Sequence, residues 1–506
     1  MPFALTIKDE NPTRLNWNYT SEPNEILCGG EPCWIPRGKV LGGSSVVNAM
    51  ICIRGNRRDY DHWSELGNEG WDFESVLPYF KKSEDNLDPE IAKDTKYHST
   101  GGYLKVSKFT GIHPTTPVLA EGWKELGYNE VDFNGPTQTG YSYYQATQYN
   151  AERWSVNRAF LEPVRRTRPN LKVITNVRVT KVLIDPDSKT AYGVEYIGEN
   201  NRNISGKLFA KKDVILSGGT VGSAELLLRS GIGPKEVLDP LSIPTIQNLQ
   251  VGENYQDHFC AQLVEFEFGE YEEETVPDLL KDLVGYMKPI REGKYTQGLI
   301  NEIIVLGKTK FADPDDYPDL EITFHVNHAK SKGQKNVLVF NHSLNRPKSR
   351  GKLTINDTEP FSPPLIYQNY FSDPDDVKVF VDGIDLAKRL EKTEAFKKYG
   401  LILKNDFNVT VDNLKTILKD PRWKDYTYRD QFTNYHITGT CKMGPKNDTA
   451  AVVDNKLKVY GVNNLRVIDA SIMPHLIGAN LMCTTVMIAE KGADLIKQYW
   501  NSSKAE

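Results

Sequence analysis

The stretch KKDVILSGGTVGSAELLLRSGIGP, residues 211–234, constrains the fold of this chain more than any other. A short apolar run ends in paired glycines, and a helical pattern follows that ends at Gly231 and Pro234. A strand, a glycine turn and a helix in this order are typical of a doubly wound sheet. The stretch therefore predicts an α/β fold.

Further segments predict a mixture of strands and helices. The segments that read as strands are 169–185, 191–197 and 352–371, the last in a second sheet. Apolar residues recur at helical spacing in 372–396, where Asp373 fits the N-cap and Pro374 the first helical position.

Composition excludes several classes of protein. A formal net charge of −5 over 506 residues gives no reason to expect a nucleic-acid partner. No apolar run is long enough for a transmembrane helix, so we expect no membrane span. Residues 1–17 have neither a basic n-region nor an apolar h-region, and therefore do not read as a signal peptide.

N-glycosylation sequons and cysteine residues give evidence about the cellular compartment of the protein. N-x-S/T sequons, weak support for secretion, occur at Asn18, Asn203, Asn341, Asn356, Asn408, Asn447 and Asn501. Cys28 and Cys33 could close a small loop, but buried free thiols explain the cysteine pattern at least as well.

The string GKVLGGSSVVN, from Gly38 to Asn48, predicts a close approach to the backbone. Paired glycines let amide groups approach a phosphate or a flat ring without interference from a Cβ atom. Ser44, Ser45 and Asn48 add hydroxyl and amide groups that can bond it. Taken alone, the string also fits an ordinary turn.

Extended to residues 36–63, PRGKVLGGSSVVNAMICIRGNRRDYDHW, this string resembles the first signature of the glucose–methanol–choline (GMC) flavoprotein oxidoreductases. Further resemblances follow in the family's order at residues 176–183, 217–234, 251–258, 434–445, 465–474 and 480–496. The resemblance runs from about residue 15 to 496 and is nearest to the insect FAD glucose-dehydrogenase-like branch.

The resemblance implies a discontinuous, doubly wound FAD-binding domain and a substrate domain built on an antiparallel sheet, α+β overall. We expect an FAD-binding N-terminal region over 1–257 and a substrate-domain insertion or linker over 258–348. The C-terminal region, 349–496, is expected to hold the substrate sheet and then return to the FAD domain with the catalytic pair.

Oxidation of an alcohol moves a hydride to flavin N5 while the hydroxyl loses its proton, and histidine is the natural base near neutral pH. An adjacent donor steadies the alkoxide-like oxygen. The resemblance places His436 at the base position and Asn480 at its partner position. Asn480 alone could be the N-cap of the following helix, and both roles can hold together. Met482 and Thr484 stand where the family often has Asn and Pro, so the substrate of relatives cannot be carried over.

The resemblance also implies contacts to FAD. The residues expected to make them are Gly42, Gly43, Ser44, Ser45, Asn48, Val177, Asp469, Ala470, Asn480 and Met482. Val177 is expected near the adenosine, and for Asp469 a plain turn role competes. A helix N-terminus after Asn480, pointed at the flavin pyrimidine edge, would favour anionic reduced flavin.

The remaining histidines and motifs give weaker evidence about function. We expect His475 to line a pocket or lie at the surface. His325 and His328 lack a second ligand pair at metal spacing, so ordinary strand histidines are the better interpretation, and no metal is predicted. No G-x-S-x-G motif is present, which argues against a serine hydrolase.

The family begins with a strand, a G-x-G-x-x-G turn, a helix and an acidic strand end that hold the ADP half of FAD. We find no such unit, and therefore expect the N-terminal dinucleotide-binding unit to be lacking. An incomplete sequence is the favoured explanation. A shortened form without turnover, and strands supplied by another chain, are the alternatives.

The sequence therefore predicts an FAD-dependent oxidoreductase acting on CH–OH donors, with a small alcohol or sugar as substrate. The electron acceptor, a quinone-type compound or oxygen, stays open. A non-catalytic remnant of the family, acting as a binding or structural protein, is the alternative. We expect an extracellular location from the family and the sequons.

Overall fold

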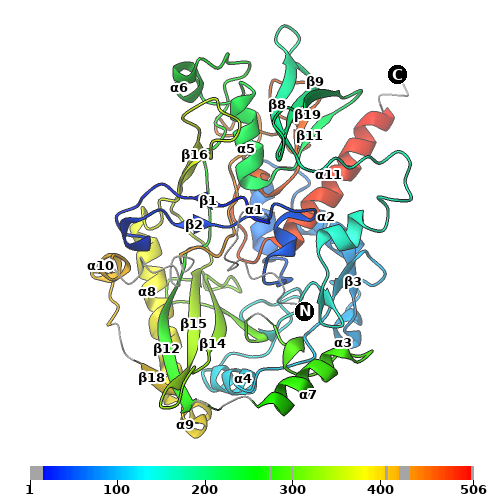
Figure 1. The fold of residues 1–506 in the computed structure, drawn as a ribbon. Helices are drawn as coiled ribbons and strands as arrows, with labels where there is room; N and C mark the ends of the chain where they lie inside the picture. The colour runs from blue at the N-terminus through cyan, green and yellow to red at the C-terminus, as the bar shows by residue number, and fades with distance from the viewer. Residues whose placement is uncertain are drawn as a thin grey trace.

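The computed structural model describes residues 15–270, 272, 275–298, 300–404, 408–420 and 432–502. Figure 1 shows an upper part built around β8, β9, β11 and β19 and a lower part built around a larger sheet with β12, β14 and β15. The helices α1 and α2 lie between these two parts, and α11 runs from the middle of the molecule up alongside the upper part. In the described ranges no helix combines the length and the apolar character needed to cross a membrane.

The strand–glycine–helix unit predicted from residues 211–234 is present. β11 (Val214–Leu216) leads through Gly219, whose φ is +76°, into α5 (Gly219–Arg229). β11 pairs in parallel with β19 (Leu465–Val467), which lies far away in the sequence. The upper part is therefore assembled from two distant segments, as a discontinuous domain requires.

A three-stranded antiparallel sheet, in the order β10-β9-β8, lies beside this unit. Its strands are β8 (Val177–Asp185), β9 (Thr190–Gly198) and β10 (Ser205–Phe209). The segments 169–185 and 191–197 therefore contain the predicted strands, although the first strand begins only at Val177.

The lower part contains a six-stranded antiparallel sheet in the order β18-β12-β15-β14-β13-β5. Its strands are β5 (Gly140–Tyr143), β12 (Cys260–Glu270), β13 (Ile303–Gly307), β14 (Leu320–Asn327), β15 (Lys335–Leu344) and β18 (Ile402–Lys404). We call this the substrate sheet. It draws strands from all three of the expected chain regions.

The segment 352–371 was expected to form strands of a second sheet, and it forms a sheet of two strands that is separate from the substrate sheet. It forms β16 (Lys352–Thr354) and β17 (Leu365–Tyr367), which pair only with each other in the described chain. β16 lies near α5 in the upper part (Figure 1). Apolar alternation identifies a strand but not the strand that it pairs with.

The two faces of the substrate sheet differ in character. On one face Ile322 and Phe324 are buried in a cluster with Phe380 and Ile384 of α8 (Pro374–Lys388). This helix has the predicted cap, since Asp373 accepts a hydrogen bond from the next turn, and its predicted apolar residues are buried. The other face presents alternate residues, including polar ones, toward the upper part.

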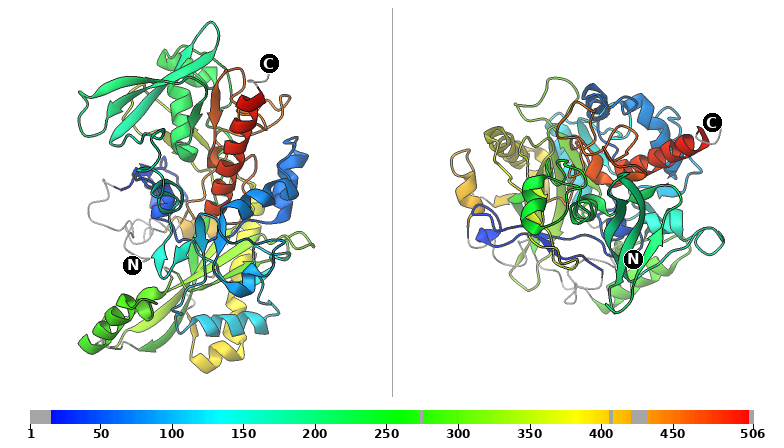
Figure 2. Two further views of the ribbon diagram at one scale, coloured as in Figure 1. Left: turned by 90° about the vertical axis from the view of Figure 1, so that its right-hand side faces the viewer. Right: turned by 90° about the horizontal axis from the view of Figure 1, so that it is seen from above.

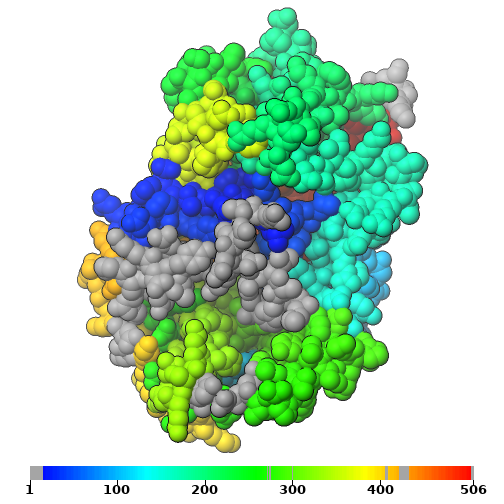
Figure 3. Space-filling view, viewed as in Figure 1, coloured from blue at the N-terminus to red at the C-terminus, as the bar shows by residue number. Residues whose placement is uncertain are grey.

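The remaining elements cover the sheets and join the two parts. The helices among them are α1 (Arg57–Glu65), α2 (Phe73–Ser83), α3 (Pro89–Ala92), α4 (Thr116–Glu125), α6 (Lys235–Leu238), α7 (Val276–Met287), α9 (Glu394–Tyr399), α10 (Leu414–Leu418) and α11 (Met482–Ser502). The short strands are β1 (Tyr19–Thr20), β2 (Trp34–Ile35), β3 (Glu84–Asn86), β4 (Leu104–Val106), β6 (Gln148–Tyr149) and β7 (Glu152–Arg153). Figure 2 shows α7 projecting at the edge of the lower part, and Figure 3 shows the N-terminal segment crossing the face between the two parts.

Disulfides tie distant segments together. Cys28 pairs with Cys33, as the small-loop interpretation predicted, and Cys52 pairs with Cys483 at the start of α11. The second bond joins the N-terminal and C-terminal regions of the chain close to Asn480. The other two cysteines are buried.

Candidate active site

His436 lies in a loop that a buried carboxylate positions. Its backbone N–H donates to Oδ1 of Asp257 at 2.8 Å. The other carboxylate oxygen accepts from the hydroxyl of Tyr370 at 2.6 Å and from Thr433. Burial raises the pKa of Asp257 to about 6, although the Thr433 and Tyr370 hydrogen bonds oppose that shift.

Asn480 lies just before α11 and contacts His436. Its Nδ2 is 3.2 Å from Nε2 of His436. The loop before it is held by Gly478, whose N–H donates to Asp59 at 3.0 Å. Asn480 does not cap α11, because its Oδ1 has no hydrogen bond to any described residue. The amide is therefore available to the site.

A second histidine lies behind the first. Nδ1 of His258 is 2.8 Å from Nδ1 of His436. Burial lowers the pKa of His258 to about 3, and the nearby Arg346 guanidinium lowers it further. Burial also holds the pKa of His436 well below its usual range, with His258 and Arg37 acting in the same direction. Both rings are therefore neutral at pH 7, and His436 can accept a proton.

The predicted glycine turn has the conformation that only glycine adopts readily. Gly42 and Gly43 have φ values of +96° and +53°. A Cβ atom on Gly43 would meet nothing within 4 Å, so the backbone borders open space there. Ser44 accepts from the N–H of Gly38 at 3.2 Å, and the hydroxyl of Ser45 donates to Gly42 at 2.7 Å.

Asn48 connects this turn to the helix that follows Asn480. Its Nδ2 donates to Sδ of Met482 at 3.2 Å, while its Oδ1 accepts from Arg153 at 2.7 Å. Met482 is the first residue of α11. The glycine turn and the His436–Asn480 pair, far apart in the sequence, are thus brought together at the start of this helix.

Val177 is another residue that the sequence predicts to contact the cofactor. Val177 begins β8, next to Arg178, whose Nε donates to Glu199 at 2.9 Å. Glu199 also pairs with Lys39 at 2.8 Å, so the start of β8 lies beside the glycine turn.

Asp469 has a structural role in this fold. Its carboxylate accepts from Gly219 at the start of α5, from Ser223, and from the backbone and hydroxyl of Ser471. It is the N-cap of the short turn that begins at Ala470. Four donors engage its oxygens, which supports the competing turn role for the side chain.

The other histidines lie elsewhere. His475 is exposed, with its Nε2 3.4 Å from Arg350 and its ring against His62. His325 lies in β14 and His328 just beyond it. The described residues contain no cluster of His, Cys, Asp and Glu that could hold a metal ion.

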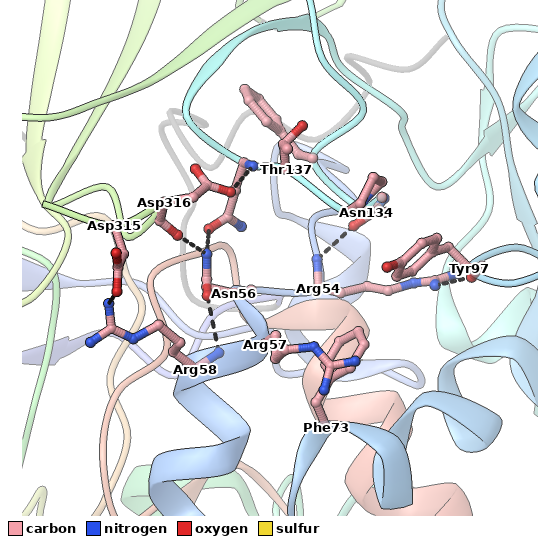
Figure 4. Close-up of a pocket in the computed structure, with 15 residues that line it drawn as sticks. Arg54, Asn56, Arg57, Arg58, Phe73, Tyr97, Asn134, Thr137, Asp315 and Asp316 are labelled. Atoms are coloured by element: carbon pink, nitrogen blue, oxygen red, sulfur yellow. Dashed lines mark hydrogen bonds and ion pairs between the residues drawn. The ribbon is translucent and has the colours of Figure 1, made fainter. Parts of the chain in front are cut away.

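A separate cavity of about 240 Å³ lies beside residues 54–58 (Figure 4). Three of its arginines are held by carboxylates: Arg54 by Glu84, Arg57 by Glu74 and Arg58 by Asp313. Neither residue of the histidine–asparagine pair lines it. We assign no ligand to this cavity.

Sequence reasoning missed three residues beside the pair: Asp257, His258 and Glu321. The first two belong to the string VGENYQDH, which was identified without roles for its members. The signal for Glu321 was a single acidic residue inside the apolar run LEITFHV.

The site fits a flat cofactor between its two sides. Open space borders Gly43, Asn480 has an acceptor without a partner among the described residues, and the Asn48–Met482 contact brings these features together. Glycine amide groups and a helix N-terminus are the groups that proteins offer to phosphates and ring edges. The residues present therefore fit a flavin.

Comparison with known families decides the class of protein. Residues 23–260 match the N-terminal family model described as GMC oxidoreductase, and residues 347–489 match the C-terminal one. The chain is a GMC oxidoreductase. The α/β fold, FAD as cofactor and the oxidation of CH–OH groups are thereby confirmed, and the comparisons support an enzyme over a non-catalytic remnant.

Curated relatives carry related names. "Glucose dehydrogenase [FAD, quinone]" of Drosophila pseudoobscura pseudoobscura is 39% identical over 96% of this chain and 79% of its own length. "Alcohol dehydrogenase [acceptor]" of Pseudomonas putida is 35% identical over 98% of this chain and 88% of its own. Mitochondrial choline dehydrogenase of Mus musculus is 34% identical over 98% of this chain and 81% of its own.

Solved structures share the fold of this GMC oxidoreductase. An FAD-dependent oxidoreductase from Chaetomium thermophilum has a TM-score of 0.83 at 24% identity, over 96% of this chain and 91% of its own. A formate oxidase has a TM-score of 0.81 at 25% identity, over 97% and 89%.

One expectation needs correction. The N-terminal family model is matched by residues 23–260, so the comparison does not support the expectation that the N-terminal dinucleotide-binding unit is lacking.

Proposed function

We propose that this GMC oxidoreductase oxidises an alcohol or sugar with His436 as the base and Asn480 as the group that holds the reacting oxygen. The 3.2 Å contact between Nε2 of His436 and Nδ2 of Asn480 carries the proposal. Bound FAD would accept the hydride at its N5 atom. His436, neutral at pH 7, takes the hydroxyl proton, and the N–H of Asn480 that faces Nε2 of His436 turns to the substrate oxygen as negative charge develops on it.

We assign the cofactor contacts to two sides of the site. Gly42, Gly43 and Ser44 offer backbone and hydroxyl groups on one side, while Ser45 and Asn48 hold that turn in place through their own hydrogen bonds. On the other side lie Met482 and the N-terminus of α11, whose dipole stabilises negative charge near it.

Two further contacts belong to the same proposal. Val177 packs near the adenosine, and the start of β8 beside the glycine turn supports this placement. Asp469 and Ala470 meet the flavin through backbone groups, because protein donors already engage the Asp469 carboxylate.

Replacing the base tests the assignment. We expect His436→Ala to lower turnover by about 10²- to 10⁴-fold, the span typical of a general base, while FAD content stays unchanged. Dye reduction by the FAD-loaded protein with glucose, simple alcohols and choline measures turnover. Exposed His475→Ala is the matched control. Equal turnover of His436→Ala and the wild type would remove the assignment.

The acceptor and the compartment follow from separate observations. The Drosophila relative's name includes a quinone, which supports a quinone-type acceptor, and peroxide formed during turnover would instead show an oxidase.

The Cys28–Cys33 and Cys52–Cys483 disulfides support an extracellular location. Asn203 and Asn447 are exposed sequons, whereas Asn341 is partly buried within the substrate sheet. Mass spectrometry of glycopeptides from secreted protein tests this location.

A further inference from the structure

Glu321 is a buried carboxylate beside the proposed catalytic pair. Its side chain belongs to β14, and the residue is 1% exposed. Neither carboxylate oxygen has a hydrogen bond of standard geometry to any described residue, and the amide of Asn480 is the group that interacts with it. A buried acceptor without a donor is unfavourable, so the position calls for a ligand that donates.

The register of the substrate sheet shows what Glu321 faces. Glu321 lies opposite Ser343 of β15, and Thr323 lies opposite Asn341, so these side chains share one face. Asn434, two residues before the proposed base, donates to Ser343. The polar face of the sheet therefore lies against the loop that carries His436.

Asn341 and Asn480 hold further acceptors of the same kind. The amide nitrogen of Asn341 donates to Asn434 at 3.2 Å, while its Oδ1 has no partner among the described residues. The Oδ1 of Asn480 likewise has no hydrogen-bond partner among the described residues. Asn341 is the diagonal neighbour of Glu321 across two paired strands, a position about 7–8 Å away.

The orientation of the Asn480 amide agrees with its neighbours. Nε2 of His436 and the carboxylate of Glu321 both accept hydrogen bonds, so the amide nitrogen belongs between them. Three side chains at the site, Glu321, Asn341 and Asn480, therefore hold acceptor oxygens without a partner among the described residues, and Nε2 of His258 is also unpartnered. A molecule with several hydroxyl groups has a donor for each of these oxygens.

We propose that Glu321 and Asn341 form a subsite that accepts hydrogen bonds from substrate hydroxyl groups remote from the carbon that is oxidised. The substrate is then a polyhydroxylated alcohol rather than a simple or cationic one. This inference rests on the proposed oxidation at His436 and Asn480 and names its substrate class.

Both the ionised and the neutral form of Glu321 can hydrogen-bond a substrate hydroxyl group. Burial raises the pKa of Glu321 to about 7, although the Asn480 interaction opposes this shift. Near pH 7 the carboxyl group exchanges between its two forms. A hydroxyl group bonds to either form, because it both donates and accepts, whereas a cation requires the charged form.

Steady-state kinetics of the FAD-loaded enzyme test the subsite. We compare D-glucose, choline and 1-butanol with a dye as acceptor, for the wild type, Glu321→Leu and Asn341→Leu. Glu321→Leu should lower kcat/KM for glucose about 10- to 150-fold more than for 1-butanol, as expected for hydrogen bonds to a charged group. Asn341→Leu should also lower kcat/KM for glucose more than for 1-butanol, by about 2- to 10-fold.

Two controls separate the possible outcomes. Glu270→Gln changes an exposed carboxylate at the far end of β12, opposite Lys335, and its kinetics should match the wild type. Calorimetric titration with glucono-1,5-lactone measures binding without turnover, and both Leu variants should bind it more weakly. Equal losses for glucose and 1-butanol, or a preference for choline that Glu321→Leu abolishes, would overturn the subsite. Lactone binding that the variants weaken, with no oxidation of any alcohol by the wild type, would support the subsite and contradict the proposed function.

Discussion

Nδ1 of His258 lies 2.8 Å from Nδ1 of His436, and the two rings meet edge to face. One of these nitrogens must donate. The pKa of His258 is lowered to about 3, chiefly by burial, while backbone hydrogen bonds at Asn345 and Ile477 favour a proton on this ring. We assign that proton to Nε2, which has no hydrogen-bond partner of standard geometry among the described residues, and Nδ1 of His258 is then the acceptor. His436 then carries its proton on Nδ1, and the lone pair of Nε2, which faces the Asn480 amide at 3.2 Å, is the one that acts as a base.

Replacing His258 should therefore change the ionisation of His436 as well as the rate. In His258→Phe the acceptor is lost, and we expect turnover to fall about 10- to 100-fold, as for other residues that orient an active imidazole. His258 also lowers the pKa of His436, so its removal should move the acid limb of the kcat/KM profile to higher pH. The pH dependence of dye reduction measures both effects.

The exposed His475 provides the control for this experiment. His475→Phe makes the same chemical change away from the pair and should leave the pH profile in place. A slower His258→Phe enzyme with an unchanged acid limb would mean that His258 only supports packing.

The disulfide between Cys52 and Cys483 should stabilise the fold and the site together. It closes a loop with a sequence separation of 431 residues, and it anchors α11 just after Asn480. We expect Cys52→Ser to lower the free energy of unfolding by about 2–5 kcal/mol. Turnover should fall as well, because the start of α11 loses an anchor. Thermal unfolding followed by fluorescence, together with dye reduction, measures both changes.

The disulfide between Cys28 and Cys33 is the matched control. Its sequence separation is 5 residues, so Cys28→Ser should cost less stability and leave turnover near the wild-type value. A stable and fully active Cys52→Ser variant would contradict the role of the long-range bond.

The buried ion cluster around His98 predicts how stability depends on pH. His98 contacts Asp132 at 2.7 Å and Glu84 at 3.0 Å. Burial alone would lower the pKa of His98, but these two carboxylates raise it to about 9. The folded pKa exceeds the unfolded one, so the contribution is fully present below about pH 6.5 and is lost as pH rises through 9.

His98→Gln should remove that dependence. Its unfolding temperature should lie below that of the wild type at pH 6, by an amount that corresponds to about 3 kcal/mol. The difference should shrink between pH 6.5 and pH 9.5, since the wild type loses its contribution there. A constant difference across this range, measured by calorimetry, would show that the ion cluster does not titrate as described.

Local signals were enough to predict much of the fold. The strand and helix around Gly219 were correct because the turn residues stand next to the elements that they join. The start of the helix predicted over 372–396 was correct because Asp373 and Pro374 mark it, but the helix ends at Lys388 and Glu394–Tyr399 form a separate helix. The partners of β16 and β17 were not predicted, because pairing depends on where chain segments lie in space.

The site was only partly predictable for a similar reason. His436 and Asn480 were identified through the resemblance to a family, and the structure brings them together. The contact between His258 and His436 spans 178 residues and leaves no periodic signal in the sequence. Glu321 lies in a strand, and only the register of the sheet shows which residues lie on the same face as its side chain.

The open space at Gly43 predicts a selective loss of cofactor. Gly43→Leu places a side chain where a Cβ atom now meets nothing, and where we place the flavin. The positive φ of +53° adds about 1–2 kcal/mol of backbone strain. Gly333→Leu has the same two properties, a φ of +85° and open space at Cβ, at the turn between β14 and β15. We expect loss of FAD only in Gly43→Leu, as measured by flavin absorbance of the purified proteins, and a larger fall in its unfolding temperature because bound cofactor stabilises the native state. Full FAD content in Gly43→Leu would place the cofactor elsewhere.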